Sequence, residues 1–344
     1  MSASESEEVW LLTGNRPGEV AQQRALAMAL AMPFRELPVA RMVPTGRDVV
    51  FDFTALRPPW PRLAISFGKT LTAALRVREL GGGSVRLVHL GLPRKLAVGA
   101  LDLIIPMPTD CYVDAANVLR IRMPFNPAPP LDRNSPGALR LLASNLPRPW
   151  LALMVGGPTS RLPLEPCEIV RTVAAVGART EERGGSLFVS TSPRTPAGAI
   201  ASLRSALPAH SEFHVFDPFE ARANPYAALL NLADELFVTG DSASMIAECW
   251  RTGKPLWVAP LGMPPLRRFM RTVRGVVPRP MIASGYIAGD VNIGRWIDQL
   301  SSAGHIGILG LSDPTLAYTS RRDDDLSRAV ARIHEMLRSR DGCP

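Results

Sequence analysis

The sequence has almost no lysine, no clustered cysteine and no long apolar run. Only three of the 39 basic residues are lysines, so the net charge of +8 is carried by arginine, the side chain suited to bidentate phosphate or carboxylate contacts. No run of about 18 apolar residues is present, which excludes a transmembrane helix. The first eight residues are acidic and do not resemble a signal or transit peptide. We therefore expect a cytoplasmic protein, either free or peripheral to the inner membrane.

The sequence also lacks the patterns of a metal site. The four cysteines are far apart in the sequence, and no histidines cluster with them. Asp323, Asp324 and Asp325 follow two arginines at a predicted helix start, where acidic residues favour the helix dipole. We expect no metal and no cofactor beyond a co-substrate.

Short apolar runs alternate with segments of helical spacing, which is typical of parallel α/β folds. A proline-rich stretch from Pro124 to Pro136 interrupts this alternation and precedes a short apolar segment that stops at Leu146–Pro149, where a domain boundary is predicted. We expect an N-terminal domain over 1–147, a second domain over 148–320 and a C-terminal helix within 321–344. Both domains are predicted to be Rossmann-like and doubly wound, facing a cleft. The predicted strands are Val9–Leu12, Leu63–Ser66, Arg86–Leu90, Leu103–Ile105, Leu151–Val155, Leu187–Ser190, Phe213–Phe216, Leu236–Val238 and Leu256–Ala259.

The segment Thr239–Pro255 is the most informative part of the chain. A strand ends there, Asp241 and Ser242 can cap the next helix, and the free amides of Ser242 to Met245 would bind an anion. Ser244 and Glu248 are four residues apart and share a helix face. This spacing suits a nucleotide diphosphate, with phosphates at the helix start and ribose hydroxyls on Glu248. The alternative is that Asp241 and Ser242 are ordinary caps and Glu248 is a solvated helix residue.

Two other strand ends of the second domain carry small or phosphate-binding residues. Gly156 and Gly157 follow one strand and allow close backbone approach. The other strand ends in hydroxyl side chains followed by a guanidinium. We therefore include these residues in the candidate nucleotide site: Ser190, Thr191, Ser192 and Arg194.

In the first domain, Glu19 and His89 are the available acid–base groups near the expected strand ends. A structural role for His89 is the alternative.

The stretch between Cys249 and Gly289 contains seven basic residues and no acidic one. Arg267 and Arg268 lie in this stretch and could contact a pyrophosphate or an anionic membrane; a solvated face is the alternative. No aromatic residues interleave with these arginines as a stacking surface, so nucleic acid is not an expected partner.

Several of these motifs occur in a fixed order that resembles the elongated-mitochondria family, which comprises the plant mitochondrial-fission factor and its bacterial relatives. The matching segments are Val155–Pro158, Ser190–Pro196, Asn224–Tyr226, Thr239–Met245 with Glu248, Gly253–Pro255 and Arg267–Phe269.

This family is similar to glycosyltransferases built from two Rossmann domains, the GT-B type. The resemblance implies that Glu248 contacts the donor ribose, that Ser242 and Ser244 hold the diphosphate, and that the C-terminal helix crosses back onto the first domain. The chain departs from the family pattern at Glu19–Gln22 and at His89–Arg94, both in the presumed acceptor domain.

Two functions are consistent with these features. One is a metal-independent glycosyltransferase that uses a nucleotide-diphosphate sugar and a lipid-linked or glycan acceptor, with Glu19 or His89 as the base. The other is a non-catalytic adaptor that recruits a protein partner.

Overall fold

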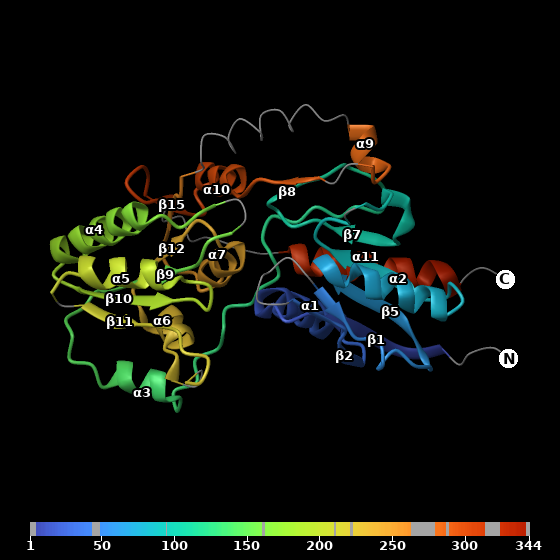
Figure 1. Ribbon diagram of the computed structural model, residues 1–344, viewed down its shortest axis with the longest axis horizontal. Helices are drawn as coiled ribbons and strands as arrows, with labels where there is room; N and C mark the ends of the chain where they lie inside the picture. The colour runs from blue at the N-terminus through green and yellow to red at the C-terminus, as the bar shows by residue number, and fades with distance from the viewer. Residues whose placement is uncertain are drawn as a thin grey trace. The chain divides into compact units, whose positions relative to one another are not determined.

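The computed structural model describes residues 5–42, 49–93, 95–159, 162–209, 211–220, 223–262, 279–286, 289–313 and 324–341. The chain divides into two compact units (Figure 1). Unit 1 is formed by Met1–Asn126, Val276–Asn292 and Arg322–Pro344, and unit 2 by Pro127–Gly275 and Ile293–Arg321.

This division differs from the boundaries expected from the sequence in two places. The first unit ends at Asn126 rather than at residue 147, because helix α3 (Pro136–Leu142) packs against α6 (Tyr226–Leu232) of unit 2. Residues 276–292 belong to unit 1, because β14 (Asp290–Val291) pairs with β8 (Asp110–Cys111).

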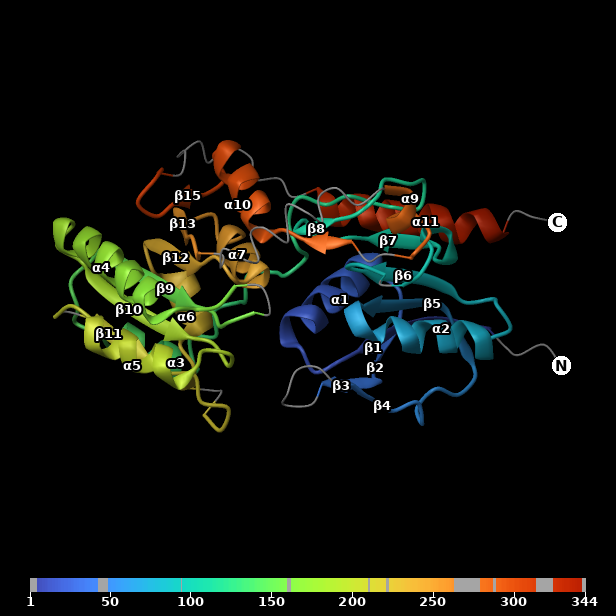
Figure 2. The ribbon, with the colours of Figure 1, turned by 45° about the horizontal axis from the view of Figure 1, so that its top comes forward.

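Unit 1 is built on a five-stranded parallel sheet with strand order β2-β1-β5-β6-β7 (Figure 2). The chain moves from β1 to β2 on one side and then to β5 on the other, so the strand order reverses between β1 and β5. The elements are β1 (Glu5–Thr13), α1 (Pro17–Leu30), β2 (Phe34–Pro38), β5 (Trp60–Phe67), α2 (Leu71–Leu80), β6 (Arg86–Leu90), β7 (Leu103–Ile105) and α11 (Asp325–Asp341).

Both faces of this sheet are apolar and covered by helices, as parallel sheets require. Val9 and Leu11 of β1 face a core shared with α1 and α11, whereas Trp10 and Leu12 face α2. Ala329, Ile333 and Leu337 of α11 are buried in the first of these cores.

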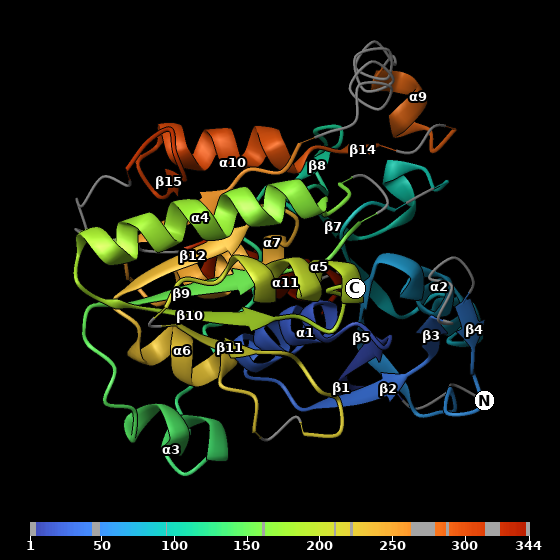
Figure 3. The same cartoon turned by 60° about the vertical axis from the view of Figure 1, so that its left-hand side comes forward.

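Unit 2 is built on a six-stranded parallel sheet with strand order β11-β10-β9-β12-β13-β15. Helices α4 and α5 pack on one face, and α6 lies on the opposite face (Figure 3). The elements are β9 (Trp150–Val155), α4 (Pro166–Glu182), β10 (Ser186–Thr191), α5 (Ala197–Ala206), β11 (Ser211–His214), β12 (Glu235–Thr239), α7 (Ala243–Trp250), β13 (Leu256–Ala259), α10 (Ile293–Ser302) and β15 (Gly307–Ile308).

The prediction of two Rossmann-like α/β domains is confirmed by these two parallel sheets, and each strand predicted from an apolar run overlaps an observed strand. The strand predicted over Phe213–Phe216 lies two residues earlier, as β11. The sequence did not reveal several short or edge elements. These are β2, β3 (Ala40–Met42), β4 (Val49–Phe51), β8, β14, β15 and α9 (Arg279–Ala283), together with the 3-10 turns Gly68–Thr70 and Val98–Ala100.

Candidate functional site

The candidate nucleotide site lies where the strand order of the second sheet reverses. From β9 the chain moves outward through β10 and β11, and it then returns to the other side of β9 as β12. The loops after β9 and β12 therefore diverge at the carboxyl edge of the sheet, which is where open α/β sheets bind ligands. Gly156 and Gly157 follow β9, and Asp241 to Met245 follow β12.

The carboxylate of Asp241 connects three loops at this edge. Its Oδ2 accepts a hydrogen bond from Gly157 N at 2.9 Å, and its Oδ1 accepts one from Thr239 Oγ1 at 2.6 Å. Arg194 Nη2, from the loop after β10, lies 3.4 Å from Oδ2. Burial raises the pKa of Asp241, while the bonds from Thr239 and Gly157 and the charge of Arg194 oppose that rise. Asp241 therefore acts as an internal link between loops rather than as an open ligand contact.

The two glycines after β9 are required by this close packing. A Cβ atom on Gly156 would lie 2.1 Å from Asp241 Oδ2, and one on Gly157 would lie 2.2 Å from the Arg194 carbonyl oxygen. The Gly156 amide donates to Thr239 Oγ1 at 2.8 Å. Both glycine amides are therefore occupied by side chains of the protein itself.

The hydroxyl residues after β10 hold their own loop. Thr191 Oγ1 accepts from Phe216 N at 2.9 Å, and Ser190 is buried within the strand. Ser192 Oγ lies 3.1 Å from the hydroxyl of Thr195, which in turn donates to Gly156 O at 2.5 Å. In this loop Arg194 is exposed, and its Nη1 donates to Gly157 O at 3.1 Å.

Helix α7 presents its N-terminus at the same edge. Ser242 is the N-cap, and its hydroxyl accepts from Met245 N at 3.5 Å. Ser244 and Met245 are half-buried in the first turn. The Met245 amide is therefore paired with Ser242, and the other amides of the first turn and the positive end of the helix dipole favour an anion.

Glu248 lies one turn further along α7 and is half-buried. Its Oε2 accepts a hydrogen bond from the Tyr226 hydroxyl at 2.5 Å. Burial raises the pKa of Glu248 to about 7, and the Tyr226 bond and the charge of Arg251 limit that rise. This geometry does not match the alternative of a fully solvated helix residue.

Glu19 occupies the corresponding switch point of unit 1. It lies in the first turn of α1 after β1 and forms an ion pair with Arg16 at 3.1 Å. After β5, Gly68 adopts a φ of +56°, and a Cβ there would lie 3.8 Å from a carboxylate oxygen of Glu19. Burial raises the pKa of Glu19, and the charges of Arg16 and Lys69 oppose it. Glu19 is thus a half-buried carboxyl with a raised pKa at a strand-order reversal.

His89 lies in the interior of unit 1. Its side chain is 0% exposed, and its Nδ1 lies 2.9 Å from Ser66 Oγ on the neighbouring strand. Burial lowers the pKa of His89 to about 4, although the backbone of Leu92 opposes that shift. This placement agrees with the structural alternative, and Glu19 is the acid–base candidate that reaches the surface.

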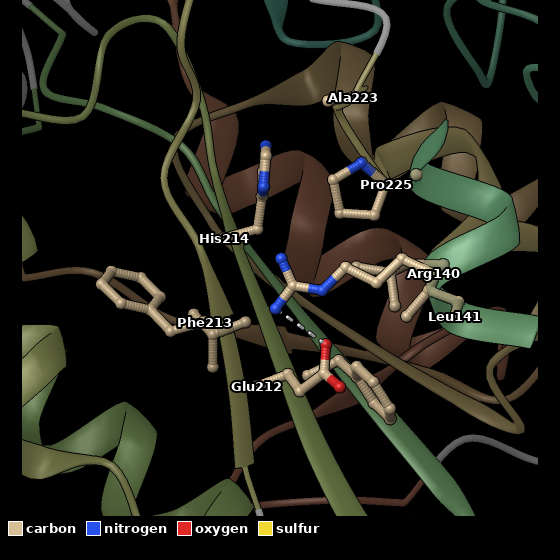
Figure 4. A pocket seen from close by; sticks show the side chains of 11 residues that line it. Arg140, Leu141, Glu212, Phe213, His214, Ala223 and Pro225 are labelled. Atoms are coloured by element: carbon tan, nitrogen blue, oxygen red, sulfur yellow. Dashed lines mark ion pairs between the residues drawn. The ribbon is translucent and has the colours of Figure 1, made fainter. Parts of the chain in front are cut away.

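A separate cavity of unit 2 lies between α3, α6 and the edge strand β11 (Figure 4). Arg140 and Glu212 form an ion pair across it at 3.5 Å, beside the half-buried His214. Its volume of about 20 Å³ accommodates roughly one water molecule, which excludes a nucleotide sugar.

The described residues contain no group of three metal-ligating side chains, and none of their helices is long and apolar enough to cross a membrane. Arg267 and Arg268 lie outside the described residues.

The sequence from residue 17 to residue 284 matches the model of the mitochondrial fission ELM1 family. The chain belongs to this family. No curated protein gives a significant match to this ELM1-family chain.

Solved structures similar to this ELM1-family chain include sugar-nucleotide enzymes with GT-B architecture. A candidate UDP-N-acetylglucosamine 2-epimerase from Listeria monocytogenes superposes with a TM-score of 0.51 at 15% identity, over 97% of each chain. MnaA from S. aureus, solved with UDP, gives a TM-score of 0.49 at 13% identity, over 98% of this chain and 99% of its own. The calicheamicin glycosyltransferase CalG4 gives 0.46 at 11% identity, over 98% and 97%. The likeness to the Listeria protein shows that the ELM1-family chain has the GT-B fold.

Sequence reasoning assigned no role to three residues that organise the site, namely Thr195, Tyr226 and Thr239. All three lie within the motifs that carry the family resemblance, but each also has a hydrogen-bond partner in another segment, which is Gly156 for Thr195 and Thr239 and Glu248 for Tyr226. The position of these residues within the family motifs was therefore the only indication in the sequence that they matter. Their hydrogen-bond partners could be identified only from the folded structure.

Proposed function

We propose that this chain binds a nucleotide-diphosphate sugar at the carboxyl edge of the second sheet and transfers the sugar to an acceptor. The observation that carries the proposal is the convergence of the α7 N-terminus, Arg194 and Glu248 at one strand-order reversal. The helix end and the guanidinium would hold the diphosphate, and Glu248 would accept hydrogen bonds from the ribose.

In this proposal the negative charge that develops on the departing diphosphate is stabilised by groups already in place. Ser242 caps the start of α7 and Asp241 pairs with the Arg194 guanidinium, so little reorganisation is needed during reaction. Glu19 of unit 1 would remove the proton from an acceptor hydroxyl, and its raised pKa suits a general base. No step requires a metal. A lipid-linked or glycan acceptor and peripheral contact with an anionic membrane are further parts of the proposal.

A thermal-shift panel of UDP-, GDP-, ADP-, CMP- and dTDP-sugars tests the binding site. At about 100 times Kd, a ligand adds roughly 2.7 kcal/mol of stability, which corresponds to a shift of roughly 5–10 °C for a unit of this size. The UDP sugars come first, because the Listeria relative is a candidate UDP-N-acetylglucosamine 2-epimerase.

Two substitutions separate binding from chemistry. Glu248→Ala should reduce the shift, whereas Glu182→Ala on the exposed surface of α4 should retain it in full. Glu19→Gln should retain the shift but lower the rate at which nucleotide diphosphate is released as the sugar is transferred to an acceptor hydroxyl or to water. If no nucleotide sugar stabilises the protein, the donor site is refuted and the adaptor function of this family becomes the better description.

A further inference from the structure

Tyr226 and Glu248 join two helices at the candidate nucleotide site. Tyr226 is the first residue of α6, Glu248 lies in α7, and the phenol hydroxyl donates to Glu248 Oε2 at 2.5 Å. Burial and the neighbouring Glu248 charge raise the pKa of Tyr226 well above its ordinary value, so the phenol remains a proton donor at every physiological pH.

The position of Tyr226 is set by the local start of α6. Asn224 Oδ1 accepts a hydrogen bond from Tyr226 N at 3.0 Å, and Pro225 O accepts one from Leu229 N at 2.7 Å. Proline restricts the backbone immediately before the tyrosine. The Asn224–Pro225 pair therefore fixes where the phenol hydroxyl meets the carboxylate.

The Tyr226 hydroxyl restrains the Glu248 carboxylate but occupies only part of its hydrogen-bonding capacity. An ionised carboxylate has two oxygens and about four acceptor positions, and the phenol uses one of them on Oε2. The remaining positions are available to a ligand that presents paired hydroxyl donors, and the rotation of the carboxylate is restrained beforehand. A restrained acceptor loses less conformational entropy when a ligand binds.

We propose that Tyr226 is a positioning residue whose hydroxyl orients the Glu248 carboxylate to accept the vicinal hydroxyls of a ribonucleoside diphosphate. This inference rests on the proposed function. It predicts that the site recognises the ribose of the nucleotide and discriminates against a nucleotide with 2′-deoxyribose.

The groups that face Glu248 determine how recognition depends on pH. These are the Tyr226 hydroxyl from α6 and, from α7 and its C-cap, the Cys249 thiol and the Arg251 guanidinium. Ribose hydroxyls donate to the ionised carboxylate, so affinity should rise as the pH increases through about 7. Removal of the Tyr226 hydroxyl removes an interaction that lowers the pKa of Glu248, and the rise should then move to higher pH.

The test is calorimetric titration of the full chain with UDP and with 2′-deoxy-UDP between pH 6 and pH 8. Tyr226→Phe should weaken UDP binding by about tenfold and 2′-deoxy-UDP binding by less, because a hydrogen bond to a charged group is involved. Its pH profile for UDP should shift upward. Tyr286→Phe, at an 80% exposed tyrosine of unit 1, is the matched control and should leave both affinities unchanged.

Glu248→Gln preserves the side-chain shape and removes the titrating group. In that background Tyr226→Phe should have little further effect, and the remaining pH dependence should come from the diphosphate alone. If the wild-type protein binds neither probe, the proposed nucleotide site itself fails. If it binds them but Tyr226→Phe reduces both affinities equally, or changes neither affinity nor pH profile, the positioning role is overturned and the site stands.

Discussion

At the residue scale, Gly156 shows how little space the site leaves for side chains. A methyl group there would collide with the Asp241 carboxylate, which is held by Thr239, Gly157 and Arg194. We expect Gly156→Ala to lower the free energy of unfolding by about 1–3 kcal/mol and to weaken nucleotide binding. Gly198→Ala in α5 is the control, because a Cβ there meets no atom within 4 Å. Equal urea midpoints for the two variants would contradict this account.

His89 predicts a dependence of stability on pH. Its pKa is about 4 in the folded state and 6.5 when unperturbed, so the unfolded chain binds the extra proton between these values. The stabilisation is present above pH 6.5 and is lost as the pH falls toward 4, by about 3 kcal/mol. His89→Gln removes the titrating group. Its thermal unfolding temperature should therefore fall less than that of the wild type between pH 6.5 and 4.5, and parallel curves would contradict the buried neutral histidine.

The sequence predicted which residues lie at the candidate site better than it predicted what each of them does there. Small and acidic residues at strand ends predicted that three loops meet at one edge of the sheet, and the structure brings those loops together. The link from Asp241 to Gly157 spans 84 residues, so no local pattern could reveal that this carboxylate binds the protein's own loops. The sequence likewise left open whether His89 has an acid–base or a structural role. A polar residue within a strand does not show whether other segments bury it.

At the scale of elements, α11 completes the core of unit 1. Ile333 is fully buried among side chains that include Leu26 and Leu30 of α1. We expect Ile333→Ala to destabilise unit 1 by about 2–5 kcal/mol, because truncation leaves a cavity. Glu335→Ala, two residues from Ile333 and 63% exposed, should change stability by less than about 0.5 kcal/mol. Thermal unfolding measures both, and a mild effect of Ile333→Ala would show that α11 is dispensable to the core.

Most of the predicted strands are buried on both faces, because a continuous apolar run identifies such a strand without knowledge of its neighbours. The exception is β11, a half-buried edge strand. Strand β2 has no such run. It is an edge strand whose Arg35 and Glu36 form ion pairs with Glu8 and Arg24, so its sequence resembles a surface loop. The strands β8 and β14 are two residues long and, among the described residues, pair only with each other. The sequence therefore does not indicate that residues 276–292 belong to unit 1.

At the scale of the whole molecule, the charge of +8 predicts how the protein responds to anionic surfaces. It should co-sediment with vesicles that contain phosphatidylglycerol at low ionic strength and should be released at about 0.5 M salt. Added salt shortens the range over which the basic protein and the anionic lipid attract each other. Vesicles of phosphatidylcholine alone are the control. Arg267→Ser together with Arg268→Ser should weaken the binding, and wild-type protein that ignores the anionic vesicles would refute peripheral membrane contact.

The interleaving of the two units along the chain has a consequence for synthesis and for dissection of the protein. Unit 1 begins the chain, but the buried face of α11 is translated after every strand of unit 2. During synthesis, residues 127–275 can therefore form most of the second sheet while the core of unit 1 still lacks helix α11. A fragment ending at residue 126 would expose the apolar surface of α1 that α11 covers. An isolated unit 1 would instead need two designed connections, one from residue 126 to residue 276 and one from residue 292 to residue 322.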